Sequence, residues 1–450
     1  MKTDESTKLV LEKLNFVTSK LSFKKFTVGI NLKILVLFLM GQTCLAYDFS
    51  ASLNQESQFF YLNPPSSEAT FGRLTLQNQG SFALAGFDLK ADSKVSFDES
   101  TTTNQQTLFN PQRFGLLKST QYFDLFIGGL TVPIKGTDLN NIFDVAQGKD
   151  YRQPFNTQTV GSFAVQLEAP IGALTTQIFY IPKNRRSLLP NINSPWWPRT
   201  SALPLTQSSG TFYLPEKMSY QFASESELNK PFDNNFGLMS QYSFSSLDLQ
   251  FFYFSGANQL PQISPHVNID ITSYDPLVGV INPPVDLNLL WYKSEHIGLG
   301  LTSVLFDWIA KANCKKQTDF LVDNQNSNAC TFTIENSLSI SRFSLRYFVQ
   351  LNRSWKKTES SSELETLLGF FEKSTALGLY LDLEKKGVLT GALIYNEKNP
   401  STLAHLSYDF KWTEKFKTTL ALSSIFSSGG VLAEAYKKTN TTSLILNYDF

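Results

Sequence analysis

The fold is decided by the last ten residues, Thr441-Thr442-Ser443-Leu444-Ile445-Leu446-Asn447-Tyr448-Asp449-Phe450. Apolar side chains occupy every second position from Leu444 to Phe450, and the residues between them are polar except for Ile445. Because successive side chains of a strand point to opposite faces, this stretch has one apolar face and one mostly polar face. Its length also matches a tilted strand that crosses a bilayer.

This terminal stretch resembles the insertion signal of bacterial outer-membrane barrels, which ends on a phenylalanine with an aromatic residue two positions earlier. The resemblance implies that Leu446, Tyr448 and Phe450 are recognised by the barrel-assembly machinery of a Gram-negative cell. Taken alone, the stretch also fits the last strand of a soluble sandwich of two β-sheets.

The composition favours a large all-β protein. The chain has 450 residues, of which 42% are hydrophobic and 17% charged, so it can build a large core or a large barrel and is not disordered. Aromatic residues make up 14%, a load that suits strands and interfacial girdles. The formal net charge of zero gives no basic footprint for nucleic acid. A mean hydropathy of −0.15 excludes a helical membrane protein of this size, whereas a barrel exposes only alternate residues to lipid.

Residues 1–46 are predicted to be a leader that contains a secretory signal peptide, and residues 47–450 the barrel. Lys24, Lys25 and Lys33 precede the short apolar run 34–40, and small residues lead up to Ala46. A basic flank, an apolar run too short to span a bilayer and small residues before the cut are typical of such signals. We expect cleavage after Ala46 and export to the bacterial outer membrane. Lipidation of Cys44 is the alternative.

Two cysteines remain after cleavage, Cys314 and Cys330. An even pair in an exported chain predicts a disulfide, which would stabilise the fold by ~3 kcal/mol for a loop of this size. Two unpaired thiols are the alternative.

From Tyr47 onward the pattern has period two, with turn residues between the strands. It predicts a transmembrane antiparallel up-and-down β-barrel of about 18 strands, with 16 as the alternative. The third strand changes phase at Gly86, as at a β-bulge. The predicted strands cover residues 47–62, 70–78, 81–97, 112–119, 121–133, 160–169, 173–182, 235–245, 247–255, 285–293, 296–309, 331–341, 343–353, 376–384, 387–396, 401–412, 416–426 and 441–450.

Short and long connections alternate along the chain. Short links include Ser245-Ser246, Ser294-Glu295, Ser341-Arg342 and Lys385-Lys386. The long ones cover residues 99–111, 134–159, 183–234, 256–284, 310–330 and 354–375. This alternation is typical of outer-membrane barrels, which have short periplasmic turns and long extracellular loops. It places both cysteines in an extracellular loop.

Charged side chains in a loop that enters a barrel can narrow the pore and set its electric field. The loop candidates are Asp138, Asp144, Asp150, Arg152, Arg185 and Arg186, and the alternative is a solvated loop whose Asp and Asn residues make turns. Alternation places further charges on the lumen face, among them Arg73, Glu168, Asp286, Glu335, Arg346 and Asp409. Both signs occur, so no preference for anions or cations follows. Trp196 and Trp197, between prolines, are candidates for stacking on a ligand or for anchoring the loop at the interface.

Several of these motifs occur in a familiar order: Gly136-Thr137-Asp138, Asp150-Tyr151-Arg152, Ile181-Pro182 and Ser194-Pro195-Trp196. Over residues 69–200 and the last five strands, the chain resembles porin-like outer-membrane proteins catalogued as a domain of unknown function. It departs from them at Lys135-Gly136, where the family has Trp-Gly, and at Gly148-Lys149, where it has Asn-Pro. The resemblance implies a barrel, and a channel or carrier for apolar or otherwise poorly permeating compounds.

Nothing in the sequence indicates an enzyme, a cofactor or a metal. The three histidines, His266, His296 and His405, have no metal-ligand spacing and no nucleophile signature beside them. The first hypothesis is a porin-like channel, monomeric or trimeric, for passive or facilitated transport of small solutes, including apolar ones. The alternative is a surface scaffold or adhesin with a blocked lumen. The expected partners are outer-membrane lipid, the assembly machinery and a small solute.

Overall fold

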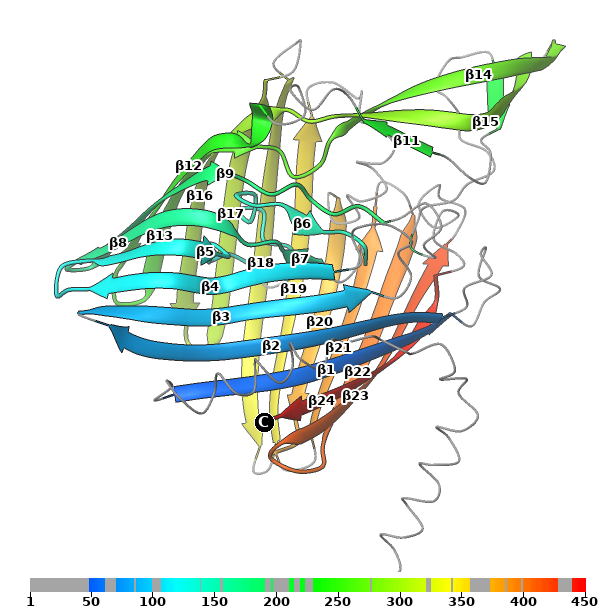
Figure 1. The fold of residues 1–450 in the computed structure, drawn as a ribbon. Coiled ribbons are helices and arrows are strands. Elements are labelled where there is room, and N and C mark those ends of the chain that lie inside the picture. The colour runs from blue at the N-terminus through cyan, green and yellow to red at the C-terminus, as the bar shows by residue number, and fades with distance from the viewer. Residues whose placement is uncertain are drawn as a thin grey trace, which may run out of the picture. The chain divides into compact units, whose positions relative to one another are not determined.

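The computed structural model is a closed antiparallel β-barrel of 18 strands (Figure 1). It describes residues 48–60, 70–84, 86–98, 107–137, 139–153, 157–190, 196, 210–213, 219–222, 230–275, 277–320, 325–340, 343–356, 373–384, 387–397, 400–427 and 439–450. The leader and its cleavage site lie outside the described residues. Within these ranges, no helix is long and apolar enough to cross a membrane.

The barrel strands follow one another around the ring in chain order. They are β1 (Asp48–Phe60), β2 (Thr70–Leu84), β3 (Phe87–Asp98), β4 (Thr107–Ser119), β5 (Asp124–Leu130), β8 (Ser162–Ile171), β9 (Leu174–Lys183), β12 (Asp233–Ser243), β13 (Leu247–Ala257), β16 (Lys293–Leu305), β17 (Trp308–Asp319), β18 (Gln325–Ile340), β19 (Phe343–Lys356), β20 (Ser374–Asp382), β21 (Gly387–Asn396), β22 (Ser401–Lys411), β23 (Phe416–Ser427) and β24 (Thr441–Asp449). A two-stranded sheet of β6 (Lys149–Asp150) and β7 (Gln158–Thr159) and a 3₁₀ turn at Lys230–Phe232 lie in the connections.

The ring closes between the first strand and the last. Glu56 of β1 faces Ile445 of β24 in an antiparallel register, and the Phe450 N–H donates to the carbonyl of Ala51 at 2.9 Å. Each barrel strand therefore has two neighbours, and the barrel has no open edge. The predicted all-β barrel of 18 strands is confirmed, and the alternative of 16 is wrong.

Side chains alternate between the lumen and an apolar outer surface. On β18, Thr331 and Thr333 are buried toward the lumen, whereas Phe332 and Ile334 point outward and are 45% and 53% exposed. Similar outward rows recur around the ring, including Leu377 and Leu379 of β20, Leu406 and Phe410 of β22, and Leu444 and Tyr448 of β24. A continuous exposed apolar surface of this kind is typical of a barrel solvated by lipid.

Short turns and longer connections alternate around the ring, as expected. One short turn contains Gly86, whose φ of +81° favours glycine, so the predicted bulge inside strand 81–97 is wrong. The phase change marks instead the end of β2 and the start of β3. The other short connections are residues 120–123, 172–173, 244–246, 306–307, 341–342, 383–386 and 412–415.

The predicted barrel strand 285–293 is also wrong. Most of this stretch belongs to β15 (Leu277–Leu290), which pairs with β14 (Gln262–Tyr274), β10 (Gly210–Tyr213) and β11 (Ser219–Phe222). These four strands form a separate sheet from the connections β9–β12 and β13–β16. Period-two alternation arises in any strand with one covered face, so it did not distinguish this sheet from the barrel wall.

The predicted extracellular loop 310–330 is wrong as well, because most of it forms β17 and the first part of β18. Cys314 and Cys330 lie opposite each other on these neighbouring strands, 4.1 Å apart between Cα atoms, and form a disulfide. Cys330 shares the outward face of β18 with Phe332 and Ile334. The prediction thus omitted one barrel strand, β17, and included one false strand, 285–293, so the predicted number of strands is still correct.

Replacing both cysteines with serine is expected to leave the barrel closed, because twelve register pairs still join β17 to β18. The free energy of unfolding should fall by ~3 kcal/mol or less, since the variant unfolds to a less constrained chain. The midpoint of the heat-dependent change in gel mobility measures this. An unchanged midpoint, both in the variant and in wild-type protein treated with a reducing agent, would contradict the expectation.

Candidate functional site inside the barrel

The connection of residues 131–161, between β5 and β8, lies inside the barrel; it is called the inserted loop below. Phe143 is fully buried, and its ring stacks on that of Phe252 of β13 with 5.3 Å between the ring centroids. Ile142 and Val145 belong to the same buried apolar cluster. The wall contributes Leu117, Phe126, Leu130, Ala164, Phe179, Ile181 and Phe254. Hydrophobic burial therefore holds this part of the loop against one side of the lumen, at roughly 1.5–3 kcal/mol for a large side chain such as Phe143.

Glycines in the wall make room for this cluster. A Cβ atom on Gly298 of β16 would come within 2.4 Å of Cε1 of Phe143, and one on Gly237 of β12 within 2.0 Å of Cζ of Phe179. Since real Cβ contacts are never this short, any larger residue at either position would displace a ring.

Hydrogen bonds carry the inserted loop across the lumen. Lys135 donates to Gln241 of β12 at 3.2 Å, and Gln250 of β13 donates to the Lys135 carbonyl at 3.2 Å. Further along, Gln350 of β19 accepts from the N–H of Leu139 and donates to the carbonyl of Asn140, both at 3.4 Å. Between β5, where the loop begins, and β19 lie β8, β9, β12, β13, β16, β17 and β18, so the loop reaches the nearly opposite wall.

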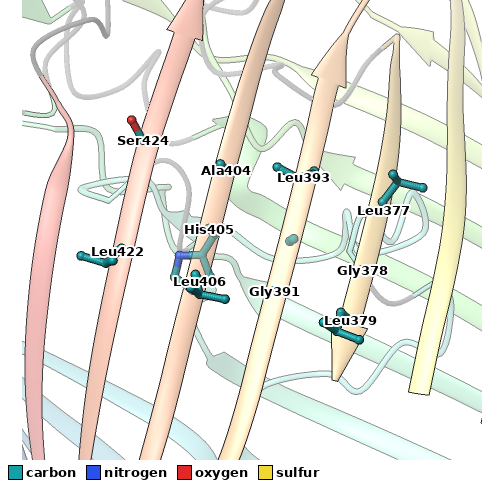
Figure 2. A pocket seen from close by; sticks show the side chains of 11 residues that line it. Leu377, Gly378, Leu379, Gly391, Leu393, Ala404, His405, Leu406, Leu422 and Ser424 are labelled. Carbon is teal, nitrogen blue, oxygen red and sulfur yellow. The ribbon is translucent and has the colours of Figure 1, made fainter. Parts of the chain in front are cut away.

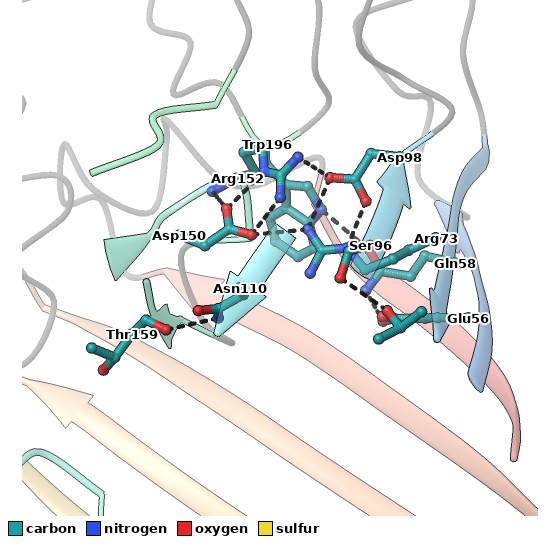
Figure 3. A network of polar contacts seen from close by, with 11 residues as sticks. Glu56, Gln58, Arg73, Ser96, Asp98, Asn110, Asp150, Arg152, Thr159 and Trp196 are labelled. Carbon is teal, nitrogen blue, oxygen red and sulfur yellow. Dashed lines mark hydrogen bonds and ion pairs between the residues drawn. The ribbon is translucent and has the colours of Figure 1, made fainter. Parts of the chain in front are cut away.

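The other end of the loop is held by two arginines and two aspartates, shown in Figure 3 and called the latch below. Arg73 of β2 donates to Asp98 of β3 at 2.6 and 3.1 Å and lies 3.3 Å from Asp150 of the loop. Arg152 donates to Asp150 at 2.7 and 2.8 Å and pairs with Asp98. All four residues are at most 5% exposed, so each charge depends on the others for stabilisation.

The charges of the latch balance, which keeps Asp150 ionised. Burial disfavours the carboxylate, but hydrogen bonds from Arg152 and the charges of Arg73 and Arg152 outweigh it, so the pKa of Asp150 lies below its ordinary value. Beside the latch, Lys149 pairs with Asp144 at 3.3 Å. Burial opposes the charged lysine, and the charge of Asp144 more than compensates, so the pKa of Lys149 is raised.

A second connection, between β9 and β12, packs on the inserted loop. The Tyr151 N–H donates to the Leu188 carbonyl at 2.7 Å, and the Leu188 N–H donates to the Lys149 carbonyl at 2.8 Å. Arg185 donates to the carbonyl of Phe109 at 2.6 Å, and burial lowers the pKa of its guanidinium. The guanidinium of Arg186 lies 5.6 Å from the centre of the Phe232 ring. The two arginines predicted as pore candidates thus help to hold this second connection in place.

Trp196 reaches the first strand of the barrel. Its indole is 4% exposed and donates to Gln58 of β1 at 3.2 Å, and Gln58 donates to Glu56 at 2.7 Å. Buried in this way, the ring anchors the second connection to the wall. Trp197, its predicted partner in stacking, lies outside the described residues.

The remaining predicted charges are spread around the wall. Glu335 of β18 pairs with Lys311 of β17 at 3.2 Å and with Arg346 of β19 at 2.5 Å. Glu168 lies opposite Asp124 of β5, close to a short turn and away from the latch. Among the described residues of the predicted set, the structure therefore gathers Arg73, Asp150 and Arg152 in the latch, and Glu335 and Arg346 in a separate pair.

Two further predicted residues are not on a described strand of the barrel wall. Asp286 lies on β15, paired with Ser219 and His266 in the four-stranded sheet, so its prediction as a pore residue on a barrel strand is wrong. Asp138 lies outside the described residues.

Sequence reasoning missed Asp98, Gln350 and Lys311. Alternation along β3 would have placed Asp98 on the lumen face opposite Arg73, but it stands at the end of the strand, where face assignment is weakest. Gln350 lies on a correctly predicted strand, yet an uncharged amide gave no signal of its contact with the loop.

The wall from β20 to β24 has a different character. Its inward face carries half-buried polar side chains, namely Thr390, His405, Ser407, Asp409 and Thr419, beside buried apolar ones, namely Val388, Ile394, Leu403 and Ile425. The inward face from β5 to β13 is instead largely covered by the apolar cluster. His405 bonds Ser423 at 2.8 Å and Asp409 accepts from Thr419 at 2.6 Å, so His405, Ser407 and Asp409 do not form a catalytic relay. In the part of the chain that the structure describes, no group of three or more His, Cys, Asp or Glu could hold a metal ion.

A pocket of about 370 Å³ lies on β20 to β23, but on the outer face. Figure 2 shows Leu377, Leu379, Leu393, Leu406 and Leu422 around it, with Gly391 between the leucine-bearing strands. Leu377, Leu393 and Leu406 are exposed on the apolar outer surface, so this pocket belongs to the lipid-facing side of the wall.

Comparisons with known proteins show likeness in fold alone. No family model and no curated protein matches the chain. Among solved structures, the chain is similar to a BenF-like porin of Pseudomonas fluorescens (TM-score 0.47, 10% identity, covering 90% of this chain and 99% of that one). It is also similar to OccK2 of Pseudomonas aeruginosa (TM-score 0.46, 11% identity, covering 90% of this chain and 98% of that one). A third similar structure is Wzi of Escherichia coli (TM-score 0.49, 10% identity, covering 93% of this chain and 87% of that one).

Changing Asp150 to Asn should loosen the inserted loop, because Arg73 and Arg152 then share one buried carboxylate. Breaking a buried ion pair from one side typically costs ~3–5 kcal/mol. We expect faster trypsin cleavage after Lys149 and Arg152 in the detergent-extracted protein. Asp88→Asn, which removes a partly exposed partner 4.0 Å from Lys90, is the matched control and should cleave as wild type does. Equal cleavage of both variants would contradict the role of the latch.

The latch should also respond to acid. The pKa of Asp150 is lower in the folded protein than its ordinary value of 3.8, so its contribution is complete above that value and is lost as the pH falls through the folded pKa. Hydrogen-exchange protection of residues 149–153 should therefore be constant from neutral pH to about pH 4 and fall below it. Asp150→Asn should lack this transition; if it shows the same one, another group is responsible.

Proposed function

We propose that this protein is a channel of the bacterial outer membrane through which small solutes pass by passive or facilitated diffusion. The observation that carries the proposal is the inserted loop, which crosses the lumen from β5 to Gln350 of β19 and narrows it. A loop that enters a barrel and leaves a polar passage beside it sets the size and charge of the solutes that pass.

The passage runs along the wall from β20 to β24. Here the inward face carries half-buried polar side chains such as His405 and Asp409, while apolar ones such as Ile394 and Leu403 are buried; the wall from β5 to β13 is filled by the cluster around Phe143. This lining favours polar solutes over the apolar ones that the family resemblance implied. Charges of both signs border the passage: Lys311, Glu335 and Arg346 on one side and Asp409 on the other. We therefore expect weak selectivity between anions and cations.

The surface of the barrel supports a setting in the outer membrane. The apolar outer face contacts lipid, the short turns face the periplasm and the long connections face the cell exterior. Export uses the signal peptide cut near Ala46. Assembly uses the C-terminal strand, whose Tyr448 and Phe450 lie exposed on the outer surface, where an insertion machinery can contact them.

A surface scaffold is the second candidate. It is favoured by the four-stranded sheet of β10, β11, β14 and β15, which two long connections build outside the barrel wall. A scaffold with a blocked lumen and a channel differ in one property, the flow of ions and solutes.

Purified protein in planar bilayers should give discrete conductance steps, and loaded liposomes should swell in small polar solutes faster than in apolar ones of similar mass. Releasing the loop with Asp150→Asn should raise the step size, while Asp88→Asn should leave it unchanged. If correctly folded protein, judged by heat-dependent gel mobility, gives neither steps nor swelling, the channel proposal is wrong and the scaffold is favoured.

A further inference from the structure

Two hydroxyl groups on the lumen face of β18 are buried without a hydrogen-bond partner. Thr331 is 0% and Thr333 is 1% exposed, and neither Oγ1 atom is bonded. A buried hydroxyl that bonds nothing is costly, and such groups are usually satisfied by water or a ligand. Their position on one face, two residues apart, makes them a pair.

These threonines belong to a grid of uncharged polar side chains. Across the sheet, Thr331 lies opposite Asn313 of β17 and Asn352 of β19. Thr333 lies opposite Gln350 of β19 and, on the other side, Lys311 of β17, whose charge is paired with Glu335. Gln350 donates to Asn352 at 2.9 Å, and Asn352 donates to Ser374 of β20 at 2.9 Å. The six uncharged residues therefore offer donors and acceptors at the spacing of the sheet, about 4.8 Å between strands and ~6.8 Å along them.

The inserted loop covers this grid. Ala329 of β18 packs against the cluster that contains Phe143, and Gln350, level with Thr333, bonds the backbone at Leu139 and Asn140. Thr331 lies between Ala329 and Thr333 along β18, and its complete burial places it beneath the loop. At this point the loop contributes peptide N–H and C=O groups, which are the kind of partner that the grid accepts.

We infer that the grid of Asn313, Thr331, Thr333, Gln350, Asn352 and Ser374 is a binding site for neutral polyhydroxylated solutes, which compete with residues 139–140 of the loop for it. The inference rests on the proposed channel and names its solute class. The six uncharged groups satisfy hydroxyls, which both donate and accept, and they carry no counter-charge for an ionic solute. The one charge beside them in the register, that of Lys311 opposite Thr333, is paired with Glu335. Both bonds between the loop and Gln350 are long, at 3.4 Å, and they lie away from the latch, so a solute can replace them without disturbing it.

The test uses the full-length protein in planar bilayers with sucrose, and with polyethylene glycol of similar mass as a solute of equal bulk that lacks ring hydroxyls. Sucrose should interrupt the single-channel current at concentrations about tenfold lower than the polymer does. In Thr331→Val/Thr333→Val this difference should disappear, while the barrel stays folded because the lost hydroxyls bond nothing. Thr272→Val, on β14 of the four-stranded sheet and so not on the barrel wall, is the control and should keep the difference.

A second measurement does not depend on conductance. Sucrose should lower the hydrogen-exchange protection of residues 139–141 in wild-type protein and not in the double valine variant. If current steps occur but sucrose acts like the polymer, or if the valine variant responds as wild type does, the binding site is wrong and the channel stands. If no steps occur, the channel is wrong, and the exchange measurement alone decides whether the grid binds sucrose.

Discussion

The structure depends on closure of the hydrogen-bonded ring between β24 and β1. Lipid offers no partner for backbone N–H and C=O groups, so a sheet solvated by it must have no edge. The register from Ser52 opposite Asp449 to Phe60 opposite Thr441 provides that closure. Once the wall is closed, a connection has two places where its backbone can be satisfied, outside the ring at its ends or inside the lumen. The inserted loop uses the second.

Three kinds of interaction hold the inserted loop, and they differ in character along its length. Apolar burial fixes Phe143 against β13 and β16, and charge fixes Asp150 and Arg152 to β2 and β3. Before both of these points along the loop, the crossing at residues 139–140 depends on two long hydrogen bonds to Gln350. The loop is thus anchored firmly at two points and lightly where it spans the lumen. A light contact at this point suits the channel proposed above, in which solute would move past the loop.

The sequence predicted the wall well where the contrast between its two faces is high. Leu444, Tyr448 and Phe450 alternate with polar residues, and β24 has the expected faces. β17 was missed because its outward residues, among them Ala310, Ala312 and Cys314, are small and give little contrast. Alternation also predicted that Arg73 faces the lumen. The contact of the loop with Gln350 was beyond prediction, since it depends on how far a connection folds back, which no local pattern records.

The disulfide of Cys314 and Cys330 has a consequence for the pairing of β17 and β18. Small outward side chains on β17 specify their partners weakly, and a slip by one position would carry Phe332 and Ile334 into the aqueous interior. A covalent bond between directly opposed residues is compatible with one alignment only. The disulfide therefore fixes the register of β17 and β18, where the alternation of apolar and polar side chains specifies it least.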